Sequence, residues 1–267
     1  MKNLSNYILE AKKQNLDIDR RQPKSRSELE MIISGAFKRK QYDLNFIDTS
    51  KITDMSELFE GVKHNFDVSS WDVSNVKDMS KMFSRCYAFT GKGLENWDVS
   101  NVTDMSHMFD SCSIFIGKGL ENWDVSNVTN MYSMFLHCKK FDCDLSNWDM
   151  SNVIDTSLMF SNCAKFTGKG IENWNVSKVK SMYAMFGDCT NFNCDVSNWD
   201  VSNVTDMDSM FVNCKKFTGK GLENWNVSKV KTMRTMFNGC KFNYHELDWD
   251  LSGLSSQLKT FRNYLAD

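Results

Sequence analysis

Residues 97–115, WDVSNVTDMSHMFDSCSIF, belong to a pattern that fills most of the chain. Counted from a tryptophan at position 0, position +2 holds Val, Met or Leu, +5 holds Val or Leu, and +12 holds Phe in every complete unit. A degenerate unit precedes them and starts at Ile47. A string that recurs this often is typical of architecture, because a catalytic motif is needed only once. The eight tryptophans recur every 24 to 26 residues, at Trp71, Trp97, Trp123, Trp148, Trp174, Trp199, Trp225 and Trp249.

Two hydrophobic periods coexist inside one unit. The alternation of apolar and polar residues in WDVS, residues 97–100, predicts a short strand. Positions +8, +11, +12 and +15 have the spacing of one helix face, and they predict a short helix after the strand. In this unit those positions are Met105, Met108, Phe109 and Cys112.

A unit of one strand and one short helix cannot bury its own apolar face, whereas stacked copies can. We therefore expect an α/β repeat, a right-handed solenoid of about eight short-strand/short-helix coils with the strands on its concave face. The expected divisions are a helical N-terminal cap at 1–46, repeats at 47–248, and a degenerate last repeat with a C-terminal cap at 249–267. Within the cap, a capping box at Ser27–Glu30 predicts a helix over about 27–40, and a shorter one is expected within 3–14.

The composition restricts the classes of partner. The formal net charge is −2, so we expect no nucleic acid and no membrane as partner. Residues 1–46 carry ten Lys/Arg and six Asp/Glu, which suits either a solvated basic cap or an anion-binding arm. The nine cysteines are an odd number, and the N-terminal residues show no export signal, so reduced thiols and a cytoplasmic location are expected.

The units NWDVSNVTDMSHMFDSC (96–112) and NWDVSNVTDMDSMFVNC (198–214) resemble the BspA-like leucine-rich-repeat family over about residues 44–262. That family includes bacterial surface proteins and lipoproteins of wall-less bacteria. The resemblance implies a leucine-rich-repeat-like solenoid, an interaction role such as adhesion or host contact, and no catalytic residues. Because the chain shows no export signal, an intracellular role in a bacterium, phage or mobile element is also expected.

Several residue types that often carry chemistry fit an architectural role here. Seven cysteines share position +15, which predicts a line of buried thiols rather than a converging metal site. The methionines at +8 and +11 suit core packing. The Gly-Lys-Gly segments run from helix towards strand, opposite to a phosphate loop, so we expect return turns whose lysines form a basic edge. No catalytic set, metal site or cofactor is predicted. Those lysines are Lys92, Lys118, Lys169 and Lys220.

Position +1 is the candidate binding column, because it points outward if the tryptophan points inward. Its side chains could bond the backbone of the next turn, form an acidic strip for a cationic partner, or bind calcium. Lys178 and Lys229 replace Asn at +4, beside Lys180 and Lys231, and predict a less acidic patch. The column consists of Asp72, Asp98, Asp124, Asp149, Asn175, Asp200, Asn226 and Asp250.

The sequence thus predicts a non-catalytic scaffold that binds a protein partner through its strand face or the edge of that face. Two alternatives stay open: an inhibitor or small effector whose activity lies in residues 1–46, and an adhesion or host-contact protein as in the surface family. A monomer or a weak homodimer through the ends of the solenoid is expected.

Overall fold

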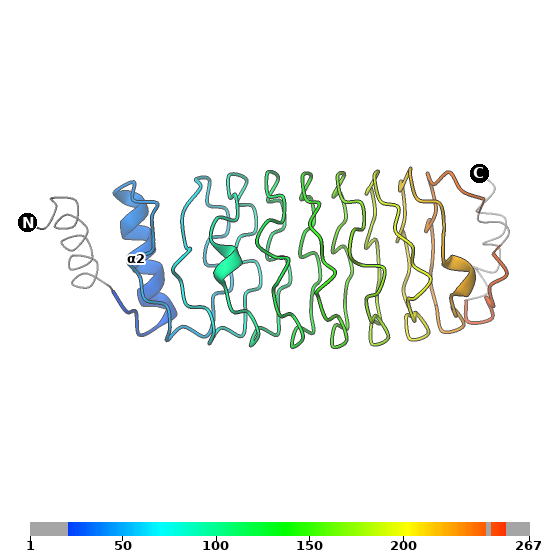
Figure 1. Ribbon diagram of the computed structural model, residues 1–267, viewed down its shortest axis with the longest axis horizontal. Coiled ribbons are helices and arrows are strands. Elements are labelled where there is room, and N and C mark those ends of the chain that lie inside the picture. The colour runs from blue at the N-terminus through cyan, green and yellow to red at the C-terminus, as the bar shows by residue number, and fades with distance from the viewer. Residues whose placement is uncertain (1–20, 244–246, 255–267) are drawn as a thin grey trace, which may run out of the picture.

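The computed structural model describes residues 21–243 and 247–254, which form a long row of similar coils with helix α2 (Arg26–Lys38) at one end (Figure 1). A coil here means the residues from one lattice position 0 to the next. The described residues contain two further helices, the single 3-10 turns η1 (Leu94–Asn96) and η2 (Leu222–Asn224). Their β-pairing consists of isolated bridges. The expected solenoid of strand–helix coils is therefore wrong: neither the strand at the tryptophan nor the helix after it forms.

Parallel bridges join successive coils at position +7, close to the place where a helix was predicted. They link Asp78 to Asp104, Asp104 to Asn130, and so on along the row. The amides at +8, +10, +12 and +14 donate to carbonyls of the next coil, as in the bonds from Met105 to Asn130 (3.1 Å) and from Phe109 to Met134 (2.9 Å). Pairing between coils thus uses every second amide of this segment.

The remaining amides of the segment close tight turns within their own coil. Met108 N donates to Met105 O at 3.2 Å, and Cys112 N donates to Phe109 O at 3.0 Å. The third residue of each turn is left-handed, with φ of 55° at His107 and 63° at Ser111. A positive φ at this place is characteristic of a type II turn. The same two left-handed positions, +10 and +14, recur in eight coils. Two left-handed residues within eight positions rule out an α-helix there.

The close spacing of the coils explains why turns replace helices. The position +12 phenylalanines of neighbouring coils have ring centroids 5.4 to 6.0 Å apart. An α-helix with its side chains is about 10 Å wide, so one helix per coil would not fit at this spacing. Paired backbones lie about 4.8 Å apart and do fit. The segment therefore satisfies half of its amides between coils and half within them.

Columns of aromatic rings fill the interior. Five neighbouring pairs of tryptophans stack with centroids 6.3 to 6.5 Å apart and nearly parallel planes. Each indole Nε1 donates to a backbone carbonyl 27 to 29 residues earlier in the chain, as Trp148 does to Leu120 O at 2.8 Å. The phenylalanine after each cysteine stacks on the position +12 ring of its own coil, with 4.2 Å between Phe160 and Phe166. The predicted column of buried indoles is confirmed.

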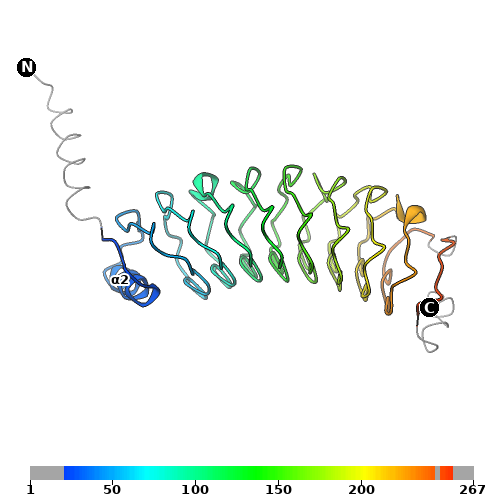
Figure 2. The ribbon, with the colours of Figure 1, turned by 90° about the horizontal axis from the view of Figure 1, so that it is seen from below.

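The row is curved, with the tryptophans on its wider side. Their centroid spacing of 6.3 to 6.5 Å exceeds the 5.4 to 6.0 Å of the position +12 phenylalanines. Figure 2 shows η1 and η2, which directly precede tryptophans, on the convex side of the arch. The concave face therefore carries the bridged turn segment, positions +6 to +14. The expectation that the tryptophan segments line the concave face is wrong.

Helix α2 covers the first coil, and the division into an N-terminal cap at 1–46 stays a prediction. Its N-cap is Ser25, whose Oγ accepts from Glu28 N, while the Glu28 carboxylate accepts from Lys24 N at 2.8 Å. The capping box therefore lies two residues before the predicted one. Leu29, Ile33 and Ala36 of α2 are buried. The shorter helix expected within 3–14 and most of the expected C-terminal cap lie outside the described residues.

Arg26 of α2 completes the open end of the first coil. In every later coil whose position +9 is described, the carbonyl there accepts from an amide of the coil before it, as Ser80 O does from Glu57 N at 2.8 Å. In the first coil, Ser56 O instead accepts from the Arg26 guanidinium. The same guanidinium donates to Asp54 Oδ2 at 3.1 Å and to Ser56 Oγ at 2.6 Å. One side chain thus replaces donors that a preceding coil would supply.

Candidate binding surfaces

The predicted position +1 column is exposed, and each of its side chains caps a turn of its own coil. Asp98 Oδ1 accepts from Ser100 N at 3.1 Å and from Ser100 Oγ at 2.6 Å. Hydrogen bonds from Ser126 lower the pKa of Asp124 below its ordinary value. The equivalent bond to the Ser amide occurs in every coil of the column. The side chains thus bond the backbone of their own coil rather than that of the next turn, and binding of a cationic partner stays a prediction. Among the described residues no cluster of three or more His, Cys, Asp or Glu could hold a metal ion.

Lys178 and Lys229 lie in one continuous polar row at position +4. Lys178 Nζ donates to Asn152 Oδ1 at 2.7 Å, and Lys229 Nζ donates to Asn203 Oδ1 at 2.8 Å. The amide of Asn203 donates in turn to Ser177 O at 2.9 Å. Each of the two lysines therefore contacts the position +4 asparagine of the preceding coil.

The Gly-Lys-Gly segments are return turns, as predicted, but their lysines do not form a free basic edge. Lys169 Nζ lies 3.0 Å from Asp144 Oδ2, and Lys220 Nζ lies 2.7 Å from Asp195 Oδ2. The Lys220 ammonium and Ser197 lower the pKa of Asp195 to about 2. Lys92 pairs with Asp67 in the same way. Three of the four lysines are therefore neutralised by the preceding coil.

The thiols form the predicted line along the stack. At position +15, each sulfur donates to the carbonyl of the position +12 phenylalanine one coil earlier, as Cys138 does to Phe109 O at 3.0 Å. Burial raises the pKa of Cys86 to about 12. All nine cysteines are free thiols. The methionines at +8 and +11 are buried in the core, as predicted.

The sequence reasoning missed position +9, which lies on the concave face. Four coils carry serine there: Ser56, Ser80, Ser106 and Ser157. The other four complete coils carry larger side chains at this position: Tyr132, Tyr183, Asp208 and Arg234. The change of residue type at +9 is visible in the sequence. The helical spacing, however, predicted that +9 lies on a short helix rather than on a binding face.

Two successive coils carry exposed side chains with large apolar parts on this face, and the coil before them carries a half-buried tyrosine. Tyr183 is 41% exposed and Ile154, at +6, is 48% exposed. Tyr132 lies in the coil before Ile154, and its ring meets that of His107 edge-on with centroids 5.0 Å apart. We call Tyr132, Ile154 and Tyr183 the tyrosine patch. Other coils carry Thr or Lys where Ile154 stands, so the patch consists of departures from the repeat.

An ion pair joins the next two coils beyond the patch. The Asp208 carboxylate accepts from Arg234 N at 2.6 Å and from Arg234 Nε at 2.9 Å, and Arg234 Nη2 lies 2.8 Å away. Burial and the neighbouring Asp208 charge raise the pKa of Asp206, two residues earlier in the chain. The concave face therefore changes from apolar to charged towards the C-terminal coils.

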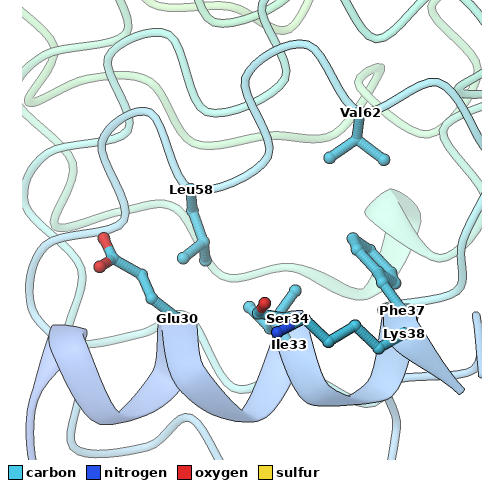
Figure 3. Close-up of a pocket in the computed structure, with 7 residues that line it drawn as sticks. All are labelled: Glu30, Ile33, Ser34, Phe37, Lys38, Leu58 and Val62. Atoms are coloured by element: carbon cyan, nitrogen blue, oxygen red, sulfur yellow. The ribbon is translucent and has the colours of Figure 1, made fainter.

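A shallow groove of about 440 Å³ follows the seam between α2 and the first coil (Figure 3). It is lined mainly by apolar and aliphatic parts of side chains, and its acid, Glu30, is paired with Arg26 Nε at 2.9 Å. The groove has the character of a packing seam. Its lining residues are Glu30, Ile33, Ser34, Phe37, Lys38, Leu58 and Val62.

Within residues 21–243 and 247–254, no helix combines the length and the apolar character that crossing a bilayer requires. No curated protein shows significant similarity to the chain. Four overlapping segments, residues 2–93, 27–118, 86–170 and 159–266, match one family, described as Mycoplasma protein of unknown function, DUF285. The overlaps reflect the internal repeats, and together the matches span nearly the whole chain. The chain therefore belongs to the DUF285 family of repeat proteins.

Proposed function

We propose that the chain is a non-catalytic scaffold that binds a protein partner through the tyrosine patch on its concave face. The observation that carries this proposal is the contrast between constant and variable positions. Buried core positions keep the same residue types in coil after coil, whereas positions +6 and +9 on the concave face change to Ile154, Tyr132 and Tyr183. None of the three is required by the repeat, since serine or threonine serves in other coils.

The chemistry of the patch suits a protein surface with apolar side chains. Tyrosine combines a large apolar ring with a hydroxyl group and is enriched at the centre of protein interfaces. Asp208 and Arg234 lie on the following coils and would give the contact a polar border. The curvature of the row would let a convex or extended partner touch several coils at once.

The alternatives from the sequence have less support. Part of residues 1–46 already serves as a cap, because Arg26 and the buried face of α2 are engaged with the first coil. An activity confined to this segment would have to use its remaining residues. Adhesion or host contact would be one form of the proposed binding, with a partner outside the cell. Both stay predictions.

Reversion to the repeat tests the proposal. Tyr132→Ser, Ile154→Thr and Tyr183→Ser together give the patch the residues that other coils carry, so the fold should be retained. The full chain is used as bait in cell lysate of a mycoplasma, and bound proteins are identified. A protein retained by the unchanged chain and lost at least tenfold with the triple variant supports the proposal.

A matched control removes exposed apolar side chains elsewhere. Tyr87→Ser and Ile116→Thr also restore residues found in other coils, within or just after the turn that follows the cysteine rather than on the concave face. This control should retain the same protein. Equal retention by the triple variant and the unchanged chain would refute a role for the patch.

A further inference from the structure

A second surface lies at the turn that follows each cysteine. The turn is closed by a bond from the position +18 amide to the cysteine carbonyl, for example from Phe141 N to Cys138 O at 3.0 Å. Positions +16 and +17 are its exposed central residues. From the Trp123 coil onward they carry six exposed lysines, and no coil has Asp or Glu at either position. We call these the lysine edge: Lys139, Lys140, Lys165, Lys215, Lys216 and Lys241.

The lysine edge differs from the paired lysines of the Gly-Lys-Gly returns in having no counter-charge. Lys169 and Lys220 are paired with acids of the preceding coil. Within the part of the chain that the structure describes, none of the six edge lysines forms an ion pair. Neighbouring coils are stacked at the 5.6 to 6.0 Å of their phenylalanines, so the ammonium groups share one narrow strip. Such a strip repels itself and attracts an anionic surface.

Apolar side chains continue the same edge over the two preceding coils. Tyr87 is 53% exposed, Ile114 is 38% exposed and Ile116 is 51% exposed. Tyr87 and Ile114 occupy positions +16 and +17 of the turn that carries the lysines, and Ile116 occupies position +19, just after that turn. The edge is therefore apolar towards the N-terminus and basic towards the C-terminus.

We propose that this edge docks on an anionic lipid bilayer. Lysines near an anionic membrane surface each strengthen attachment, and apolar side chains at the same level enter the interfacial region. The phosphate backbone of a nucleic acid would use the lysines but not the isoleucines. The net charge of −2 concealed this surface, because acids such as Asp98 and Asp124 lie on the convex side beside the tryptophans.

Binding of the full chain to vesicles tests the proposal. One set of vesicles is phosphatidylcholine alone, and the other is an equal mixture of phosphatidylcholine and phosphatidylglycerol. We expect binding only to the anionic set, with affinity falling as salt is raised. Lys139→Gln, Lys140→Gln, Lys215→Gln and Lys216→Gln combined should weaken binding about 100-fold or more.

A matched variant removes the same charge elsewhere: Lys178→Gln, Lys180→Gln, Lys229→Gln and Lys231→Gln. It should weaken binding less than about fivefold, through the long-range field alone. Equal losses in the two quadruple variants would overturn the proposal, and so would the absence of binding to anionic vesicles. Thermal unfolding of each variant checks that the coils are intact.

The apolar half of the edge has its own test. Tyr87→Ser, Ile114→Ser and Ile116→Thr should weaken vesicle binding at least tenfold, whereas the tyrosine-patch triple variant should leave it unchanged. Duplex DNA serves as the competing anion. One outcome is that the edge binds DNA more tightly than it binds anionic vesicles at the same salt, while the apolar variant binds DNA as well as the unchanged chain does. That result would identify the edge as a nucleic-acid-binding surface and overturn the bilayer proposal.

Discussion

The thiol of Cys138 donates its hydrogen to the carbonyl of Phe109 in the preceding coil, with 3.0 Å between sulfur and oxygen. The same contact recurs at every position +15 cysteine, from Cys86 to Cys240, with distances of 2.8 to 3.1 Å. The sulfur column thus works as a hydrogen-bond ladder inside the core. Only the protonated thiol can donate this bond, so the ladder links stability to pH.

Stability should fall steeply as pH rises above about 9. Burial raises the pKa of Cys86 and Cys143 to about 12, from an ordinary 9.0. Between these values the unfolded chain has lost protons that the folded chain keeps, so rising pH favours unfolding. Each buried thiol removes up to about 1.4 kcal/mol per pH unit in this window. Urea unfolding at about pH 8 and about pH 10 measures the difference.

Removal of one thiol supplies the control for this prediction. Cys138→Ala should lower stability at about pH 8, because it removes a buried donor and leaves a small cavity. It should also reduce the slope of stability against pH above about 9 by the share of one thiol. A stability that stays constant up to about pH 11 would show that the ladder does not titrate in this way.

Glycine at a left-handed position should stabilise the coils. His137 is exposed, has φ of 61° and occupies position +14, where the first coil carries Gly61. A left-handed residue with a Cβ costs about 1–2 kcal/mol, partly offset by the extra freedom of glycine in the unfolded chain. We expect His137→Gly to raise the free energy of unfolding by roughly 0.5–1 kcal/mol and His137→Val to lower it by about 1 kcal/mol.

The same pair of substitutions at Lys139 is the control for His137. Lys139 is exposed and has no positive φ, so valine should be more stable than glycine there. The order of the two variants is therefore expected to reverse between positions two residues apart. The same order at both positions would mean that the left-handed geometry stores no strain.

The buried register was predictable from sequence because it depends only on which positions repeat. Trp148, Val153 and Phe160 are buried, as are their equivalents in the complete coils, and this follows from period and polarity. The local conformation was not predictable from the same pattern. The spacing i, i+3, i+4, i+7 fits a helix face, but it equally fits two consecutive four-residue turns that bury their first and last residues.

What separates helix from turns is the neighbouring coil, which a single unit does not contain. Once Phe135 and Phe160 stack at 5.6 Å, the space for a helix is gone. The candidate sites were likewise predictable where they depend on one coil and not where they depend on how coils stack. The capping role of Asp98 could be expected from a short acid two residues before a serine. The concave exposure of Tyr183 could not, because the predicted curvature had the opposite sign.

In a Gly-Lys-Gly return, substitution of the second glycine should destabilise the fold far more than substitution of the lysine. Gly170 has φ of 87°, and a Cβ there would lie 2.4 Å from Ser146 N and 2.7 Å from Leu145 N. Both atoms are backbone and cannot move aside cheaply, so Gly170→Ala should cost about 2 kcal/mol or more. Lys169→Ala removes an exposed ion pair with Asp144 and should cost much less, because solvent screens the attraction between exposed charges. Thermal unfolding compares the two, and similar costs would contradict the assignment of a backbone role to this turn.

The hydrogen bonds of Arg26 to the first coil should contribute to the stability of that coil. Arg26→Lys keeps the charge but loses the planar fork that reaches Asp54, Ser56 Oγ and Ser56 O together. We expect the free energy of unfolding to fall by about 1–3 kcal/mol, because a half-buried carbonyl loses its donor. Hydrogen exchange should quicken in the first coil, at amides such as that of Phe59, while the amides around Phe160 keep their protection. Arg39 is exposed and forms no ion pair in the described part of α2 and its surroundings, so Arg39→Lys is the matched control. If both variants unfold alike, the guanidinium of Arg26 does not act as the substitute for a missing coil.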